Sequence, residues 1–263
     1  MSEYILSLSY GKDSLACLGA IEELGWPLDR IVHAEVWATD TIPADLPPMV
    51  EFKAKADRII KERWGIEVEH TVARDKDGKM LTYEDGFYKI FKNSVSGKNG
   101  LIWGFPFCKT GSWCQSMLKR SPLNITGINY FGIAADEPER IARHLVKENV
   151  KMPLVEAGWT EAMCRKWCEE NDLLSPIYTT ATRGGCWFCH NQGVDQLRLL
   201  RRDYPEYWAL LLKWDLDSPV TFKPDGHTVH DFDRRFALED EGIINPIHPL
   251  RWAMLDGNVQ LRF

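Results

Sequence analysis

The sequence predicts an α/β protein built on a parallel β-sheet with flanking helices, and three observations lead to this expectation. Strand-like and helix-like segments alternate through the first half of the 263-residue chain, which is typical of strands joined by helical crossovers. Hydrophobic residues make up 44% of the sequence, enough for a substantial core. A short polar turn joins the first strand directly to the first helix, a junction that often binds ligands in such sheets.

The individual elements follow from hydrophobic periodicity and helix propensity. In the first half of the chain, strands are expected over residues 4–8, 30–36, 66–72 and 124–133, and helices over residues 15–21 and 49–64. The segments Ser9–Ser14, 39–41 and 134–140 each follow a strand. Because ligands bind at the carboxyl ends of parallel strands, we expect these three segments to converge on one crevice.

The rest of the chain is predicted to be helical or irregular. Residues 74–107 are less regular and are expected to form an insert that acts as a lid or a substrate wall. Helices are expected over residues 161–171, 194–202 and 204–214, with only loops and short elements from residue 219 to the end. We therefore expect one principal domain over residues 1–192 and a mostly helical and loop C-terminal extension over residues 193–263.

Composition and charge bear on partners and location. The formal net charge of −6 gives no basic signature, so nucleic-acid binding is not implied for the chain as a whole. A local basic strip remains an option, formed by Arg198, Arg201, Arg202 and Lys213. The first residues lack a signal-peptide layout, and no apolar run reaches the roughly 18 residues that span a bilayer. We expect a cytoplasmic protein without a membrane partner, in which the seven cysteines are core residues, metal ligands or redox groups.

The junction Ser9-Tyr10-Gly11-Lys12-Asp13-Ser14 carries the main chemical signal. A turn between a buried strand and a helix N-terminus presents unpaired backbone N–H groups and the positive end of the helix dipole, which together bind phosphate. Lys12 adds a cation, Ser9 and Ser14 add hydroxyls, and Asp13 adds a carboxylate that orients a metal or a water. The segment is not a Walker A loop, because the residue after Lys12 is Asp13 and no earlier glycine precedes Gly11.

This junction resembles the PP-loop, Ser-Gly-Gly-Lys-Asp-Ser, of the ATP pyrophosphatase superfamily, which includes PAPS reductases, the ATP sulfurylase small subunit and tRNA thiolation enzymes. The resemblance implies an adenine nucleotide alpha hydrolase-like (Rossmann-like) fold that binds ATP with Mg²⁺. Tyr10 departs from the motif, since glycine is usual there, and a side chain at this position would crowd a phosphate or stack on a neighbour. The alternative is a chance Gly-Lys-Asp-Ser turn.

Two cysteine pairs form a second candidate site. Cys186 and Cys189 make a CxxC motif after two glycines, and Cys108 and Cys114 lie upstream. Four thiolates suit a tetrahedral zinc ion or a 4Fe-4S cluster with one thiolate per iron. A redox dithiol and inert thiols are the alternatives. The number of ligands does not decide between zinc and iron–sulfur.

Residues 113–123 are similar to the Cys-(x)-Arg/Glu-Leu-Lys-x-x-Pro-Leu segment of PAPS and APS reductases. Cluster-containing APS reductases carry adjacent cysteines there and a CxxC downstream, which implies a 4Fe-4S cluster here, with zinc as the alternative. Cys114 has no neighbouring cysteine, so Cys108 would have to replace it. Reductases also end in a Glu-Cys-Gly-x-His tail with the attacking cysteine, whereas no cysteine follows Cys189. Sulfonucleotide reduction by that route is therefore not expected.

Further segments extend the resemblance to about residues 4–192, since residues 152–159, 175–178 and 184–186 repeat the later order of segments in that family. Residues 132–140 resemble the Gly-x-Arg-x-x-Glu-Ser-x-x-Arg segment of PAPS reductases, which implies that Glu137 orients the site and that Arg140 meets phosphate or sulfate oxygens. The first arginine of that segment is replaced. Thr39-Asp40-Thr41 resembles the Asp-Thr-Gly turn near the adenine and ribose. The alternatives are a capped helix N-terminus and an ordinary turn after a strand.

Together these features predict an enzyme of the ATP pyrophosphatase type with Lys12 and Asp13 at the reacting phosphates. An acceptor oxygen attacks the α-phosphorus, pyrophosphate leaves, and the adenylated acceptor then takes a sulfur or nitrogen nucleophile. The acceptor, a nucleic acid or a small molecule, is not identified by the sequence. A sulfur donor protein and assembly into a homo-oligomer are further options, but the sequence identifies neither the donor nor the oligomeric state. The alternatives are a sulfonucleotide reductase that uses an external thiol and a non-catalytic nucleotide-binding module.

Overall fold

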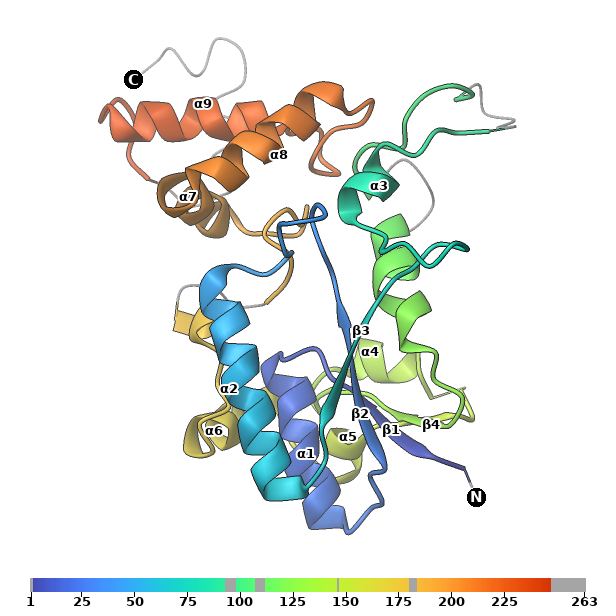
Figure 1. Cartoon of the computed structure of the whole chain (residues 1–263). Coiled ribbons are helices and arrows are strands. Elements are labelled where there is room, and N and C mark those ends of the chain that lie inside the picture. Colours follow the sequence, from blue (N-terminus) through green and yellow to red (C-terminus); the bar gives the residue numbers. More distant parts are fainter. Residues whose placement is uncertain (1, 93–97, 107–111, 146, 180–183, 247–263) are drawn as a thin grey trace. The chain divides into compact units, whose positions relative to one another are not determined.

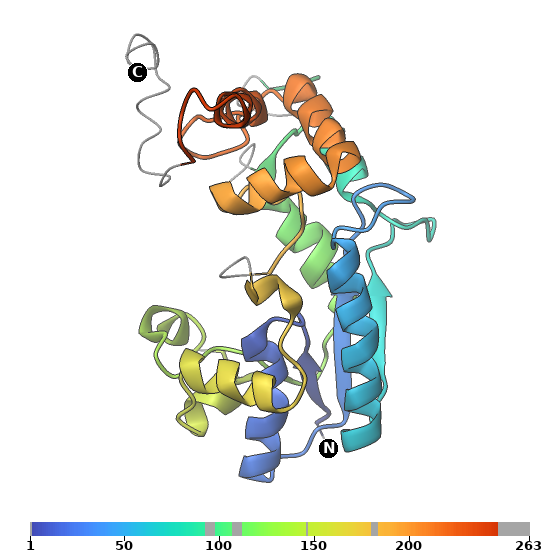
Figure 2. The same cartoon turned by 90° about the vertical axis from the view of Figure 1, so that its left-hand side faces the viewer.

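The computed structural model describes residues 2–92, 98–106, 112–145, 147–179 and 184–246 (Figures 1 and 2). The chain divides into two compact units. Unit 1 consists of Met1–Tyr83 and Cys114–Cys186, and unit 2 consists of Glu84–Trp113 and Trp187–Phe263. Unit 2 thus combines the C-terminal part of the chain with Glu84–Trp113. Residues 84–107 of this segment are most of the insert that was expected over residues 74–107. In the described part of the chain, no helix has the length and apolar character needed to cross a membrane.

Unit 1 is built on a five-stranded parallel sheet, which confirms the predicted fold class. The strand order is β3-β2-β1-β4-β5. The strands are β1 (Tyr4–Ser7), β2 (Arg30–Glu35), β3 (Val68–Val72), β4 (Ile128–Tyr130) and β5 (Val150–Lys151). In the centre of the sheet, Leu6 of β1 pairs with Ile31 on one side and with Tyr130 on the other. All three side chains are buried, as expected of a parallel sheet covered on both faces.

The helices of unit 1 surround this sheet. They are α1 (Lys12–Leu24), α2 (Pro47–Trp64), α4 (Pro138–Ala142), α5 (Pro153–Glu156) and α6 (Glu161–Glu170), with a short helix α3 (Tyr83–Phe87) at the boundary between the units. Shorter segments are the π-helical η2 (Gln115–Arg120) and the 3₁₀ turns η3 (Ser121–Leu123) and η4 (Pro176–Thr179). Helices α1 and α2 lie side by side on one face of the sheet (Figures 1 and 2).

Helix α1 is held firmly in this arrangement. Its residues 14–21 are all buried, and Gly25 ends the helix in the left-handed conformation with φ of 63°. Gly19 lies against the Trp167 ring of α6, and a Cβ atom at Gly19 would overlap that ring. The missing side chain therefore allows α6 to pack closely on α1, which fixes the position of the helix N-terminus.

The order of the strands creates a switch point beside β1. The chain moves from β1 to β2 and β3 in one direction, and then returns to place β4 on the other side of β1. In open parallel sheets, such a reversal leaves a crevice at the carboxyl ends of the two strands. The residues that follow β1 and β4 are therefore the first place to look for a ligand site.

Unit 2 is helical and rich in aromatic residues. Its helices are α7 (Val194–Asp203), α8 (Pro205–Asp217) and α9 (Val229–Asp240). Trp187 stacks on Trp214, with ring centroids 5.7 Å apart, and Phe87 and Phe188 also contact Trp214. Much of the high tryptophan content thus serves packing.

The prediction that only loops and short elements follow residue 219 is wrong for Val229–Asp240. Thr228 caps α9 by accepting a hydrogen bond from the backbone N–H of Asp231, whose carboxylate in turn accepts from the Thr228 N–H. Val229, Phe232 and Phe236 recur at helical spacing and are buried. The capping box and this apolar stripe were both visible in the sequence.

Candidate functional site

The loop between β1 and α1 is closed by its two serines. The Ser14 hydroxyl accepts hydrogen bonds from the Ser9 N–H at 3.2 Å and from the Ser9 hydroxyl at 3.0 Å, and it donates to the Gly11 carbonyl at 2.9 Å. The backbone amides of Gly11 and Asp13 donate to no group among the described residues. They lie at the N-terminus of a 13-residue helix, where the helix dipole attracts an anion.

Tyr10, which departs from the PP-loop motif, turns away from the loop and into the core. Its backbone is left-handed, with φ of 56°, and its side chain is fully buried. The phenol hydroxyl donates to the Asp57 carboxylate on α2 and lies 3.1 Å from His70 Nε2 on β3. The ring packs edge-on against His33, with ring centroids 4.8 Å apart. Tyr10 therefore packs on neighbouring side chains of the core, edge-on rather than stacked.

A buried lysine lies beside Tyr10. The Lys53 Nζ lies 2.6 Å from an Asp45 oxygen, 3.1 Å from a Glu35 oxygen and 2.7 Å from His33 Nε2. Burial and the nearby Lys53 charge lower the pKa of His33 to about 4, so His33 is neutral at pH 7. Its Nδ1–H then donates to the Leu8 carbonyl at 2.7 Å, while Nε2 accepts from Lys53.

His70 links two carboxylates in the same network. Its Nδ1 lies 2.8 Å from Glu35 and its Nε2 lies 3.0 Å from Asp57. Hydrogen bonds to Asp57 and Glu35 raise the pKa of His70 to about 9. Burial alone would raise the pKa of Glu35, but His70 and Lys53 together lower it to about 2. The network therefore holds charged groups of both signs behind the loop and fixes Tyr10.

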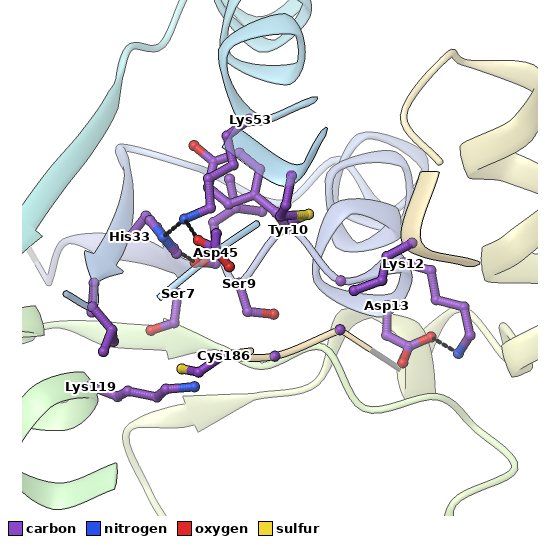
Figure 3. Close-up of a pocket in the computed structure, with 18 of the residues that line it drawn as sticks. Ser7, Ser9, Tyr10, Lys12, Asp13, His33, Asp45, Lys53, Lys119 and Cys186 are labelled. Atoms are coloured by element: carbon purple, nitrogen blue, oxygen red, sulfur yellow. Dashed lines mark hydrogen bonds and ion pairs between the residues drawn. The ribbon is translucent and has the colours of Figure 1, made fainter. Parts of the chain in front are cut away.

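A cavity of about 660 Å³ opens in front of the loop (Figure 3). Lys12 and Asp13 lie at one end, and His33, Asp45 and Lys53 lie at the other. Between them the wall is partly apolar and includes Val36, Ala44 and Met49. A cavity of this size, with a phosphate-type loop at one end and apolar side chains along its wall, has the dimensions and chemistry of a nucleotide site.

A second cavity of about 310 Å³ meets the first at the loop. The two share five lining residues, namely Ser7, Ser9, Gly11, Asp13 and Arg140. The remaining wall of the second cavity comes from the segment after β4, including Phe131 and Ile133, and from Arg120 and His144. The second cavity thus occupies the switch point between β1 and β4.

The loop cation and three carboxylates gather where α1 begins. The Lys12 Nζ lies 2.7 Å from Asp13 and 3.4 Å from Glu161. Burial alone would lower the pKa of Lys12, but its pairing with Asp13 and Glu161 raises it; burial raises the pKa of Asp13. Oxygens of Asp13, Glu137 and Glu161 all lie within 4.8 Å of one another. Such oxygens are ligands for Mg²⁺, although here they also pair with cations.

Glu137 has two kinds of partner. One of its oxygens accepts from the Ala134 N–H at 3.1 Å, and both accept from Arg140, at 2.6 and 2.7 Å. Glu137 thereby ties the segment after β4 to the start of α4. This arrangement agrees with a positioning role for Glu137 and places the Arg140 guanidinium between the two cavities. Their roles toward a ligand remain predictions.

Thr39 and Asp40 line neither of these cavities. The Thr39 hydroxyl accepts from the Thr41 and Ile42 amides, which stabilises a local turn. Asp45, a few residues further on, lines the first cavity instead. The predicted role of Thr39-Asp40 near the adenine and ribose therefore has no geometric support in the described structure.

The four predicted cysteine ligands are not brought together within one described unit. Cys186 is buried and lines the first cavity, and Cys114 is half-buried at the start of η2. Cys108 lies outside the described residues, and Cys189 belongs to unit 2. The 4Fe-4S or zinc site thus stays a prediction. The other three cysteines (Cys17, Cys164 and Cys168) are buried where α6 packs on α1, as expected of core residues.

The three arginines of the predicted basic strip in unit 2 are paired with acidic partners, and Lys213 lies over the Tyr88 ring. Arg198 pairs with Glu239 and Asp195, Arg201 pairs with Asp233 and Asp240, and Arg202 pairs with Asp203. These ion pairs leave little net positive charge for a nucleic-acid backbone on this face of unit 2.

Sequence reasoning missed several residues that line the site. Tyr178 is one, since its hydroxyl accepts a hydrogen bond from the Lys12 N–H at 3.1 Å and its side chain lines the first cavity. Others are His33, Lys53 and Glu161 in the first cavity and Arg120 and His144 in the second. Tyr178 is the last residue of segment 175–178, whose place in the chain is one of the resemblances noted above, so the sequence held a signal for it. The others come from separate elements and form no local motif.

Comparison of the chain with models of protein families, with curated proteins and with solved structures gave no match. The chemical interpretation therefore rests on the geometry of unit 1. That geometry combines open amides at a helix N-terminus, a lysine, three carboxylates and two adjoining cavities. It suits a polyphosphate in the first cavity and a second ligand beside it.

Proposed function

We propose that this chain is a PP-loop enzyme with an adenine nucleotide alpha hydrolase-like fold, which binds ATP and adenylates an acceptor with release of pyrophosphate. One observation carries the proposal. The amides of Gly11 and Asp13 are open at the N-terminus of α1, beside Lys12, and face a cavity of nucleotide size. The parallel sheet with its switch point beside β1 supports the same conclusion.

In this proposal the polyphosphate of ATP lies on the loop and the adenosine lies toward the apolar wall. The Gly11 and Asp13 amides and Lys12 bind the β- and γ-phosphates. Val36, Ala44 and Met49 offer contacts for the base and the sugar. The Lys12 ammonium has three N–H donors, and its ion pairs with Asp13 and Glu161 engage two of them, which leaves one donor for phosphate.

The proposed reaction is a displacement at the α-phosphorus. A nucleophilic oxygen of the acceptor forms a bond to the α-phosphorus while the bond to the pyrophosphate oxygen breaks, and pyrophosphate leaves with the electron pair. The loop amides and Lys12 stabilise the negative charge that builds on this leaving group. Asp13, Glu137 and Glu161 would hold the Mg²⁺ that accompanies ATP, and this ion would neutralise phosphate charge.

A second step is proposed from the cysteine motifs. A sulfur nucleophile would attack the activated carbon of the acceptor and displace AMP, which makes the chain a sulfurtransferase. Cys108, Cys114, Cys186 and Cys189 would hold the 4Fe-4S cluster, or alternatively zinc. A cluster held by all four thiolates has no open iron, so one cysteine would have to leave its iron before an incoming sulfur could bind there, whereas zinc would be structural. Cys186 supports a site near the nucleotide because it lines the first cavity.

A non-catalytic nucleotide-binding module is the second candidate. Its motives are the two departures from the family pattern, namely Tyr10 in the loop and the replaced first arginine of the segment over residues 132–140. A sulfonucleotide reductase that uses an external thiol is the remaining alternative from the sequence. These candidates differ in their products, since only the proposed enzyme releases pyrophosphate from ATP.

Pyrophosphate release tests the proposal. ATP and Mg²⁺ are incubated with the protein and a panel of acceptors, and pyrophosphate is measured by a coupled assay. We expect release that depends on one acceptor and falls by about 10²-fold or more in Asp13→Asn. The matched control is Asp172→Asn, which alters an exposed carboxylate paired with Lys55. Tight ATP binding without pyrophosphate release across the panel would instead favour the binding module.

A further inference from the structure

The second cavity is lined in part by residues that have no role in the proposed ATP site. It lies at the carboxyl ends of β1 and β4, and it shares Ser9, Gly11 and Asp13 with the first cavity. A ligand in the second cavity would therefore face the loop from the side opposite the Val36 and Met49 wall. Since the first cavity of about 660 Å³ already accommodates a nucleotide, the adjoining 310 Å³ is available for another molecule.

Positively charged groups surround this second cavity. Arg120, Arg140 and His144 line it, from η2, from α4 and from the turn after α4. Arg120 is exposed and has no acidic partner among the residues that the structure describes. Arg140 is paired with Glu137. An unpaired arginine at the mouth of a cavity is suited to bind an oxyanion through its planar set of donors.

The surroundings of His144 add to this positive character. Burial, followed by the charges of Lys147, Arg140, Arg120 and Arg143, lowers the pKa of His144. The carboxylates of this segment, Glu137 at the N-cap of α4 and Glu139 in its first turn, are already paired with Arg140 and Arg143. A bound anion would therefore offset an excess of positive charge around the His144 ring.

The other side of the second cavity is apolar. Phe131 and Ile133 line it, and the Phe131 ring packs edge-on against His144 with ring centroids 5.0 Å apart. A cationic rim beside an apolar wall suits a molecule that combines an oxyanion with an apolar or planar body. The volume of about 310 Å³ limits that body to metabolite size.

We propose that the second cavity binds the acceptor substrate through an oxyanion group, a phosphate or a carboxylate, held by Arg120 and His144. This inference rests on the proposed ATP-dependent function, because it assigns the first cavity to the nucleotide. It commits to a small molecule as the acceptor. The net charge of −6 and the ion-paired arginines of unit 2 give a nucleic-acid strand little further attraction.

Inorganic sulfate is the probe for this site, because it does not titrate near neutral pH. The full chain is labelled on histidine, the ring signal of His144 is assigned with His144→Gln, and its pH titration is followed by NMR. Sulfate is compared with chloride at constant ionic strength, in the absence and in the presence of saturating α,β-methylene-ATP. We expect sulfate to raise the pH at which His144 titrates, because the bound anion favours the protonated ring.

The matched variants are Arg120→Gln and Arg58→Gln. Both remove an exposed arginine without an acidic partner in the described structure, but Arg58 lies on α2 and lines neither cavity. Arg120→Gln should weaken the apparent sulfate affinity at His144 by about tenfold, the loss of one charge-assisted contact. Arg58→Gln should leave it unchanged. An unresponsive His144, or equal weakening in both variants, would overturn the inference.

The same titration separates this inference from the proposed function. If α,β-methylene-ATP binds and sulfate does not, the acceptor site fails and the nucleotide site stands. If sulfate binds at His144 and the nucleotide binds nowhere, the proposed function fails. If the two ligands exclude each other, the second cavity holds phosphates of the nucleotide and the acceptor inference is wrong.

Discussion

Tyr10 shows how a single residue adapts the phosphate loop of this chain. Its φ of 56° lies in the left-handed region, where a non-glycine residue costs about 1–2 kcal/mol. The buried ring and the hydrogen bond to Asp57 offset this strain. A glycine would relieve the strain, but it would leave a cavity beneath the loop. The tyrosine is therefore a structural part of this loop.

Two substitutions at Tyr10 test this balance. Tyr10→Phe should lower the free energy of unfolding by about 1–3 kcal/mol, since Asp57 loses a buried hydrogen-bond donor. Tyr10→Gly should cost more, because losing a buried aromatic ring costs about 3–5 kcal/mol and strain relief returns only part of it. Urea denaturation measures both. A Tyr10→Gly variant as stable as the wild type would contradict this account.

His70 makes the stability of the protein dependent on pH. The folded state raises its pKa from 6.5 to about 9, so the folded protein binds the proton more tightly than the unfolded chain. Its contribution is fully present below about pH 6.5 and is lost as the pH rises through about 9. His70→Gln should therefore be less stable than the wild type at pH 6, and the difference should shrink at pH 10.

Thermal unfolding at a series of pH values checks this prediction. His144→Gln is a suitable control, since the pKa of His144 is lowered and its loss should not destabilise the protein in the same way. A destabilisation by His70→Gln that stays constant from pH 6 to pH 10 would argue against the charged His70 with its two carboxylate partners.

At the scale of elements, the segment after β4 positions the loop. A Cβ atom at Gly132 would lie 2.8 Å from the Cα and backbone N of Ser14. Backbone atoms cannot move aside as a flexible side chain does, so glycine allows β4 and the start of α1 to meet. This contact forms part of the wall of the second cavity, because Ser14 and Gly132 both line it.

Gly132→Ala should separate these two elements and distort the loop. We expect a loss of about 1–3 kcal/mol of stability from overpacking, and weaker binding of α,β-methylene-ATP in the protein that remains folded. Calorimetry gives the affinity, and circular dichroism gives the folded fraction. Gly193→Ala serves as the control, since Gly193 lines neither cavity and a Cβ atom there meets only the Gln196 side chain, at 3.8 Å, among the described residues. Unchanged affinity in Gly132→Ala would mean that the loop does not depend on this contact.

The long elements were predictable and the short ones were not. Residues 4–8, 30–36 and 66–72 each carry several strand-forming residues in a row, so their assignment survives in β1, β2 and β3. Strand β5 has only two residues, Val150–Lys151, which is too short for a periodic signal. Helix α9 was not predicted, although Thr228 and Asp231 form a capping box. Its 12 residues lie between segments of turns and bends, so the apolar periodicity of the helix is short.

The site itself was predictable only where it is continuous in sequence. Ser9–Ser14 is one continuous segment between a strand-like run and a helix-like run. The sequence of these runs is enough to predict a loop that leads into a helix N-terminus. Tyr178, Lys53 and His144 reach the cavities from distant elements. Their convergence depends on strand order, and a single sequence does not reveal which side of β1 the fourth strand occupies.

At the scale of the whole molecule, the described lining residues of both cavities belong to unit 1. Unit 2 has its own buried ion pair, in which Arg235 Nε lies 2.8 Å from Glu239 and both side chains are at most 3% exposed. Glu239 also pairs with Arg198 on α7, so this pair links two helices of unit 2. Each unit thus has internal interactions that can be altered separately.

Arg235→Met should destabilise unit 2 by about 3–5 kcal/mol, because it leaves the Glu239 charge buried with one partner fewer. At a temperature where the variant is still folded, its affinity for α,β-methylene-ATP should equal that of the wild type. Arg234→Met is the matched control, since Arg234 is largely exposed and pairs with Asp231 at the surface. A large loss of nucleotide affinity in folded Arg235→Met would show that unit 2 contributes to the site.

The central claim is that the junction between β1 and α1 binds the polyphosphate of ATP. Isothermal titration calorimetry with α,β-methylene-ATP and Mg²⁺ tests it most directly, on the wild type, Lys12→Ala and the control Lys166→Ala, which alters an exposed lysine of α6. We predict that the wild type and Lys166→Ala bind alike and that Lys12→Ala, measured at a temperature where it is folded, binds at least about tenfold more weakly. Equal affinity in all three proteins, or no binding to the wild type, would contradict the claim.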